Sequence, residues 1–118
     1  MEIRSVGVVG LGTMGAGIAQ VCVQAGLDVV GREVTAELGE KGRATIERHL
    51  GRGVAKGRLT EAEKDAALQR LRVTTRLEEL AGCELVIETI VEDLDAKRAL
   101  FAELDPIVGP AAILATNT

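Results

Sequence analysis

The sequence predicts an α/β fold in which helices cover both faces of a doubly wound, mostly parallel sheet. Two observations support this prediction. Short apolar runs of strand length alternate with amphipathic stretches of helical length along all 118 residues, a pattern typical of parallel sheets. A glycine cluster over residues 10–15 also follows the first apolar run directly, as in sheets where a tight turn leads from a strand into a helix.

The first half of the chain is predicted to contain a strand, a helix, a second strand and a long helix. Residues 6–9 are a short valine-rich run, which indicates a strand buried on both faces. Apolar residues at helical spacing over 14–24 predict a helix, and Asp28–Arg32 is the second strand. Residues 35–55 have an apolar and a basic side and predict an amphipathic helix, although each of its four glycines costs about 1 kcal/mol relative to alanine.

The second half continues the alternation. Thr60 and Glu63 match a capping box, which predicts a helix that extends to Leu71. The remaining predicted elements are a weak strand over 73–75, a strong strand over 85–91, a helix over 95–104 that Pro106 closes, and a short strand over 113–115. Because a Rossmann sheet usually has six strands, we expect a Rossmann sheet that stops after its fifth or an equivalent late strand.

Composition and charge are those of one globular domain. Apolar residues make up 47% of the chain and charged residues 27%, and the formal net charge is −4. An acidic chain with a single phenylalanine, no tyrosine and no tryptophan lacks the features that nucleic-acid binding needs. No apolar run reaches the roughly 20 residues of a membrane span, and the N-terminus does not resemble a signal peptide. We therefore expect a cytoplasmic protein that binds neither nucleic acid nor membrane.

The two cysteines, Cys22 and Cys83, lie far apart in apolar surroundings, without a C-x-x-C pattern or a nearby histidine. They are expected to be small buried hydrophobic residues rather than redox-active ones. We predict no metal site.

The glycine cluster has the form G-x-G-x-x-G and comprises Gly10, Leu11, Gly12, Thr13, Met14 and Gly15. It lies between a strand and a helix and is followed by Glu33 at the end of the next strand, which is the context of a dinucleotide-binding turn. Gly10 permits the tight turn, Gly12 lets the backbone approach a pyrophosphate, and Gly15 allows close packing of helix and strand. Because an ordinary tight turn would leave Glu33 unexplained, we expect these residues to bind a dinucleotide.

The acidic residue indicates which dinucleotide is favoured. Glu33 can accept hydrogen bonds from both ribose hydroxyls of NAD, and its charge would repel the 2′-phosphate of NADP. The neighbouring Arg32 could receive that phosphate, or it could be a solvated surface charge. On balance the sequence predicts NAD as the cofactor.

Two further segments resemble a known family. Residues 85–97, LVIETIVEDLDAK, and residues 113–118, ILATNT, are similar to those of bacterial 3-hydroxybutyryl-CoA and 3-hydroxyacyl-CoA dehydrogenases, and the resemblance covers the whole chain. It implies an NAD-dependent oxidoreductase of fatty acid metabolism that interconverts an L-3-hydroxyacyl-CoA and the 3-ketoacyl-CoA by hydride transfer. Among the possible substrates, the resemblance favours 3-hydroxybutyryl-CoA. It also implies that residues 1–118 are an incomplete NAD-binding Rossmann domain, truncated before a C-terminal helical domain that makes a homodimer.

The same resemblance implies cofactor contacts outside the glycine turn. The backbone of Thr89 and the side chains of Glu92 and Lys97 are expected on the nicotinamide-ribose side of the NAD site. Considered without the family, Glu92 and Lys97 would be interpreted as an ordinary charged pair near the start of a helix.

Substrate contacts also follow from the resemblance. His49 and Lys56 fall where the family contacts the coenzyme A part of an acyl-CoA, and Asn117 is expected to approach the substrate. His49 replaces the usual serine, so it could instead only border the apolar side of its helix. Arg48, Arg52 and Lys56 could attract phosphates, although a basic helix face is as often simply solvated.

No catalytic residue is assigned. The family's catalytic His–Glu pair and an asparagine would follow Thr118, so the chain alone is expected to be inactive. Three alternatives remain: a dehydrogenase of the 3-hydroxyisobutyrate type, a hydroxyacyl carrier-protein dehydrogenase, and a non-catalytic dinucleotide-binding module. Glu33 and the ATNT ending count against the first of them.

Overall fold

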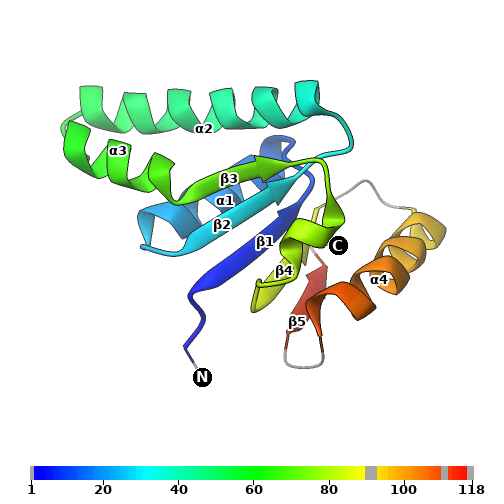
Figure 1. Cartoon of the computed structure of the whole chain (residues 1–118). Coiled ribbons are helices and arrows are strands. Elements are labelled where there is room, and N and C mark those ends of the chain that lie inside the picture. The colour runs from blue at the N-terminus through cyan, green and yellow to red at the C-terminus, as the bar shows by residue number, and fades with distance from the viewer. Residues whose placement is uncertain (1, 90–92, 110–111, 117–118) are drawn as a thin grey trace.

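The computed structural model describes residues 2–89, 93–109 and 112–116. In chain order its elements are β1 (Ser5–Val9), α1 (Thr13–Gln24), β2 (Asp28–Arg32), α2 (Ala36–Ala55), α3 (Glu61–Gln69), β3 (Leu71–Thr74), the 3₁₀ helix η1 (Leu77–Leu80), β4 (Leu85–Glu88), α4 (Leu94–Val108) and β5 (Ile113–Thr116). The strands form one parallel sheet in the order β3-β2-β1-β4-β5 (Figure 1). This order is that of a Rossmann sheet and confirms the predicted fold class. None of the described helices is long and apolar enough to cross a membrane.

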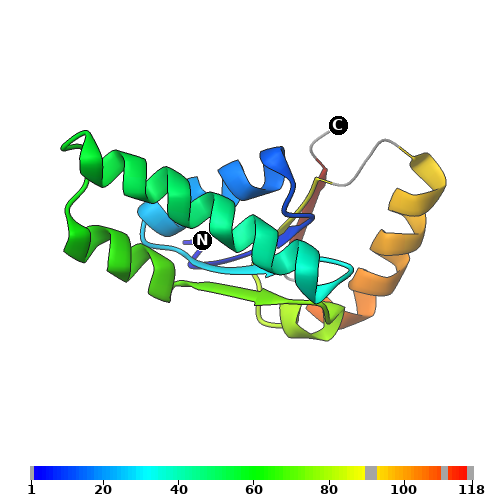
Figure 2. The ribbon, with the colours of Figure 1, turned by 90° about the horizontal axis from the view of Figure 1, so that it is seen from above.

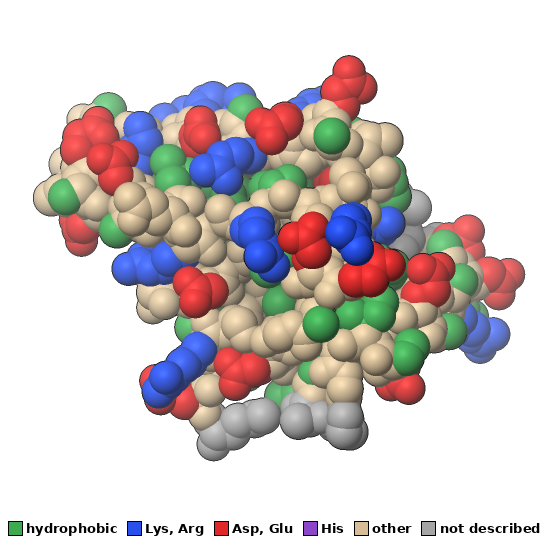
Figure 3. All heavy atoms as spheres, viewed as in Figure 1, with side chains coloured by type: hydrophobic (Ala, Val, Ile, Leu, Met, Phe, Trp, Pro, Cys, Tyr) green, Lys and Arg blue, Asp and Glu red, His purple; other side chains and the backbone are tan. Residues whose placement is uncertain are grey.

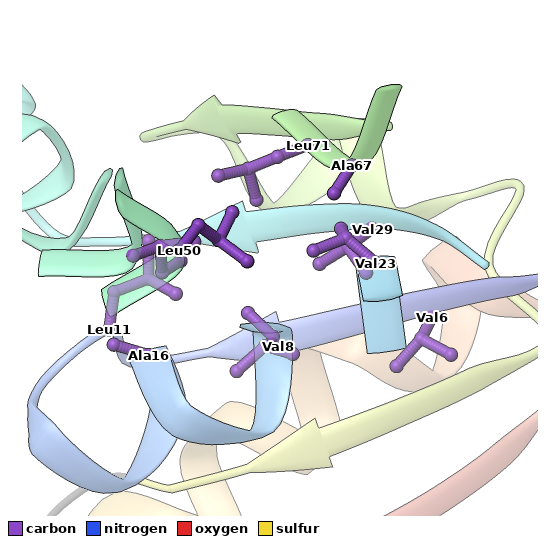
Figure 4. Packing of buried hydrophobic residues seen from close by; sticks show 11 residues of the cluster. Val6, Val8, Leu11, Ala16, Val23, Val29, Leu50, Ala67 and Leu71 are labelled. Carbon is purple, nitrogen blue, oxygen red and sulfur yellow. The ribbon is translucent and has the colours of Figure 1, made fainter. Parts of the chain in front are cut away.

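The sheet separates two hydrophobic cores. Under α1, α2 and α3, apolar side chains of β1, β2 and β3 form one core, shown at close range in Figure 4. η1 and α4 cover the other face, where Leu80, Val86 and Leu104 are fully buried. Figure 2 shows α4 on the side of the molecule away from α3. Successive strand residues therefore point into different cores, as expected for strands buried on both faces.

Glycines allow α2 to pack closely against the glycine turn. A Cβ on Gly42 would lie 2.5 Å from Cβ of Leu11, and a Cβ on Gly31 would lie 2.8 Å from the Leu11 side chain. Leu11 is consequently buried between β2 and α2, with 4% of its surface exposed. The glycines that weaken α2 as an isolated helix thus bring it next to the turn that follows β1.

The periodicity of α1 correctly predicts a helix but does not identify its buried face. Met14 and Val21, which belong to the apolar pattern, are 59% and 67% exposed. The buried residues of α1 are the small side chains Gly15, Ala16 and Ala19, together with Val23. Small side chains on this face let the helix lie close to the sheet, and this close approach decides which face is buried.

Several predicted boundaries are wrong. The strand predicted over 85–91 ends at Glu88, and the strand predicted over 73–75 is β3 at Leu71–Thr74. The helix that begins after the capping box ends at Gln69, and Leu71 instead starts β3, where it pairs with Val29 and packs into the first core. Pro106 does not close α4, which continues to Val108. Leu104 and Val108 are both buried, one turn apart, so packing holds the helix together despite the backbone donor that proline lacks.

The cysteines have different degrees of burial. Cys83 is buried in the second core, as expected, whereas Cys22 is only partly buried against the first. Burial raises the pKa of both thiols above the ordinary value.

The surface carries charges of both signs. Figure 3 shows basic and acidic side chains interspersed over the face drawn in Figure 1, in keeping with 14 basic and 18 acidic residues.

Candidate functional site

The candidate site lies at the carboxyl ends of the parallel strands, around β1 and β4. In the sheet register Val9 is paired with Arg32 on one side and with Glu88 on the other. The chain leaves β1 toward β2 and leaves β4 toward β5, so the strand order reverses between these two central strands. In open α/β sheets a crevice for ligands forms at such a switch point.

The glycine turn is held tightly against the end of β1. Gly10 has a positive φ of 96°, and its N–H donates to the carbonyl of Arg32 at 2.9 Å. A Cβ on Gly15 would lie 1.7 Å from the carbonyl oxygen of Gly10, so only glycine fits there. Gly12 is different: it is the N-cap residue of α1, without a capping side chain, and a Cβ on it would have no neighbour within 4 Å. The backbone of Gly12 therefore faces open space at a helix N-terminus, where anions bind favourably.

Glu33 is fixed beside this turn by backbone donors. Its Oε2 accepts from the N–H of Leu11 at 2.7 Å, and its Oε1 accepts from the N–H of Val34 at 3.1 Å. The neighbouring Arg32 donates from Nε to the carbonyl of Thr75 at 3.1 Å and is thus directed toward β3. The glycine turn and the acidic residue predicted to act with it are physically connected.

Thr89 connects β4 to the same turn. Its Oγ1 donates to the carbonyls of Val9 and Gly10 at 3.1 and 2.9 Å, and its N–H donates to Val9 at 3.0 Å. A Cβ on Gly15 would also lie 2.8 Å from this hydroxyl. The sequence predicted a backbone role for Thr89, and the structure adds that its side chain fixes the turn.

Lys97 lies in a network with the buried Glu88 and the exposed Thr116, which the sequence did not reveal. Its Nζ is 3.3 Å from Oε1 of Glu88 and 3.4 Å from Oγ1 of Thr116, and the Thr116 hydroxyl donates to Oε1 of Glu88 at 2.6 Å. Glu88 is fully buried and Lys97 nearly so. Glu88 belongs to the segment that carries the family resemblance, but an acidic residue ending an apolar strand gave no signal of its own. Glu92 and Asn117 lie outside the described residues.

Two cavities share His49. The first, about 430 Å³, is lined by Leu11, Gly12, Thr13, Glu33, Leu38, Lys41, Thr45, Arg48 and His49. The second, about 260 Å³, is lined by Gln20, Gln24, His49, Leu50, Arg52, Gly53, Lys56, Arg58 and Leu59. Between them, Nδ1 of His49 lies 3.2 Å from Oε1 of Gln20 on α1. The structure therefore brings His49 and Lys56 together in one cavity and places Gly12, Thr13, Glu33 and His49 in the other.

Two observations go beyond what the sequence predicted about the lining. Lys41 and Thr45 join the first cavity. They lie two turns and one turn before His49 on the same helix, and this spacing was the available signal. Met14 is not among the residues lining either cavity and instead borders an apolar hollow on the outer side of α1, with Ile18 and Val21.

Residues 5–118 match the family model described as 3-hydroxyacyl-CoA dehydrogenase, NAD binding domain. The chain belongs to this family. The match confirms the resemblance predicted from the two sequence segments, and it confirms NAD as the cofactor of the domain.

Named relatives of this NAD-binding domain family agree with the assignment. A 3-hydroxybutyryl-CoA dehydrogenase of Bradyrhizobium diazoefficiens is 47% identical over 98% of the chain and 40% of the relative. A 3-hydroxyadipyl-CoA dehydrogenase of Escherichia coli is 38% identical over 100% of the chain and 25% of the relative. The crystal structure of (S)-3-hydroxybutyryl-CoA dehydrogenase from Ralstonia eutropha has a TM-score of 0.96 at 43% identity and covers 99% of the chain and 41% of that structure. The chain thus spans about two-fifths or less of these relatives.

Proposed function

We propose that the protein takes part in the reversible interconversion of an L-3-hydroxyacyl-CoA, such as 3-hydroxybutyryl-CoA, and the 3-ketoacyl-CoA. NAD, held by the glycine turn and Glu33, would supply the acceptor for the hydride at C3, and a base would take the proton of the 3-hydroxyl group. The observation that carries this proposal is the pair of cavities sharing His49: Glu33 and the middle residues of the glycine turn line one, and three cations are among the residues that line the other. The names of the relatives support the substrate class.

The residues of this chain would bind and orient the cofactor. The backbone of the glycine turn would hold the pyrophosphate at the start of α1, and Glu33 would accept hydrogen bonds from the ribose. Its carboxylate is already oriented by the N–H of Leu11, so little reorganisation is needed on binding. Thr89 and Lys97, at the end of β4 and the start of α4, would serve the nicotinamide half, as would Glu92.

We expect NAD to bind more tightly than NADP, and the Glu33→Ala variant to narrow this preference. The variant loses the ribose acceptor and the negative charge that repels a 2′-phosphate. Unit charges about 4 Å apart repel by about 1 kcal/mol in water and about 4 kcal/mol near a protein surface, so NADP affinity should rise by roughly tenfold. Titration calorimetry with both cofactors measures the effect.

Glu33→Gln is the matched control for this experiment. It keeps the side-chain length and an oxygen that can accept from Leu11, but it removes the charge. We expect it to gain NADP affinity while losing less NAD affinity than the alanine variant. Equal affinity of the unmodified chain for both cofactors would contradict the role proposed for Glu33.

The second cavity suggests where the coenzyme A part of the substrate binds. Arg52, Lys56 and Arg58 line it together with His49, and these three cations would neutralise the phosphates of coenzyme A. Asn117 is proposed to approach the acyl end of the substrate.

Lys56→Glu should weaken coenzyme A binding by roughly five- to tenfold, because a partly exposed ion pair contributes about 1 kcal/mol and the reversal adds repulsion. Arg98→Glu, which makes the same charge change on α4, is the control and should have little effect. Titration calorimetry with coenzyme A at fixed ionic strength compares the two variants. Equal losses would show a general charge effect and count against a binding site in this cavity.

The proposal also includes features that the resemblance implies. We infer that residues 1–118 are the NAD-binding domain of a longer dehydrogenase, whose catalytic His–Glu pair and helical domain lie beyond these residues. The helical domain would make a homodimer, and the enzyme would act in the cytoplasm in fatty acid metabolism. The 40% and 25% of the relatives' lengths that the chain spans support the first of these inferences, that the chain corresponds to one domain of such enzymes.

A further inference from the structure

A buried ion pair joins three elements at the carboxyl edge of the sheet. Glu88 is the last residue of β4, Lys97 lies in the first turns of α4, and Thr116 is the last residue of β5. Glu88 and Thr116 are partners in the sheet register. The Glu88 carboxylate accepts a hydrogen bond from the Thr116 hydroxyl and forms an ion pair with the Lys97 ammonium. The network therefore fixes the start of α4 relative to the ends of two neighbouring strands.

The fold itself does not demand a charge at this position. Val9 occupies the same row of the sheet, next to Glu88, and is apolar and buried. A buried ion pair is weak evidence for stability, because well-packed apolar residues often serve as well or better. Charged groups buried in a ligand crevice are, in contrast, frequent at functional sites. Glu88 thus needs an explanation that the sheet alone does not supply.

The position of Glu88 supplies such an explanation. The next residue, Thr89, holds the carbonyl of Gly10 in the glycine turn, so the network lies directly beside the switch point of the sheet. Anchoring Lys97 to a carboxylate on the rigid end of β4 fixes where its ammonium group lies relative to that turn. A long, flexible side chain is thereby held in one arrangement before a ligand binds.

We propose that Glu88 is a positioning residue for the nicotinamide half of the cofactor and acts through Lys97. This inference rests on the assignment of Lys97 to the NAD site proposed above. Glu88 itself does not contact the cofactor; its carboxylate and the hydroxyl of Thr116 determine the position of the Lys97 ammonium. A residue that merely stabilised the fold would affect all ligands of the domain alike, whereas a positioning residue would affect only the half served by Lys97.

The experiment compares NAD with ADP, which carries the adenosine and the pyrophosphate but lacks the nicotinamide half. Calorimetric titrations of Lys97→Met, Glu88→Gln and the double variant should each show NAD binding weakened by roughly tenfold, the effect of losing one charged hydrogen bond. ADP binding should change less than about twofold. Because both residues act through one interaction, the double variant should be no worse than Lys97→Met.

Each other result has a definite meaning. If Lys97→Met weakens NAD binding and Glu88→Gln does not, Lys97 serves the cofactor but the role of Glu88 is wrong. If neither variant changes NAD binding, the assignment of Lys97 fails and the inference with it. Equal losses for NAD and ADP would show a purely structural role for Glu88. Should Glu88→Gln fail to fold, the double variant, which contains neither charge, decides: undiminished NAD affinity would overturn the proposal.

Discussion

Gly12→Val is expected to abolish measurable NAD binding while leaving the domain folded. A Cβ on Gly12 would meet no protein atom within 4 Å, and φ of Gly12 is −69°, which valine adopts without strain. The branched side chain would instead occupy the approach path of the pyrophosphate. Losing two charged hydrogen bonds of about 1.5–3 kcal/mol each weakens binding by roughly a hundredfold or more. Calorimetry measures the affinity, and urea unfolding should show a loss of only about 1 kcal/mol from the poorer N-cap.

Gly15→Ala is the matched comparison, because it changes the same turn by a smaller side chain. Its Cβ would lie 1.7 Å from the carbonyl oxygen of Gly10, so the backbone of the turn must move. We expect unfolding free energy to fall by about 3 kcal/mol, as in overpacked sites. A Gly12→Val variant that still binds NAD with unchanged affinity, or one as unstable as Gly15→Ala, would contradict the view that Gly12 faces the cofactor.

Lys97→Met should destabilise the domain by about 3–5 kcal/mol, because it leaves the buried carboxylate of Glu88 without its ammonium partner. Glu88 has no exposed surface and lies 3.3 Å from Nζ of Lys97. A loss of this size is a large part of the about 5–15 kcal/mol that stabilises an ordinary domain. Urea unfolding followed by circular dichroism measures it.

The Glu88→Gln/Lys97→Met double variant shows whether the single variant loses stability because the ion pair is broken or because the packing around Lys97 changes. With both charges removed, we expect it to recover most of the stability lost by the single variant, to within about 1–2 kcal/mol of the original chain. Surface pairs offer a contrast: Arg76 and Glu78 are largely exposed at 3.8 Å, so Arg76→Met should change stability by less than about 1 kcal/mol. A double variant as unstable as Lys97→Met would contradict the ion-pair interpretation.

Local chemistry along the chain determines much of the architecture. The valine run before Gly10, the G-x-G-x-x-G spacing and Glu33 at the end of the next strand predicted the central strand–turn–helix–strand unit, because each feature reflects a requirement of neighbouring residues. The Thr60–Glu63 capping box was predicted for the same reason and is present at 2.9 and 3.1 Å. Boundaries at Leu71 and Pro106 were wrong, because strand pairing and helix packing outweighed the local signals there.

The sequence by itself determined the fold class, the cofactor turn and the family, since these depend on spacings along the chain that can be read without knowledge of distant contacts. Only the tertiary structure showed that the buried face of α1 consists mainly of small residues while Met14 is exposed, and that Leu11 fits between two glycines. It also showed that Glu88 contacts Lys97 and Thr116. Thr116 is 28 residues from Glu88 along the chain but is its neighbour in the parallel sheet. Such contacts depend on which strands pair and how closely helices approach, and no local pattern of residues encodes either.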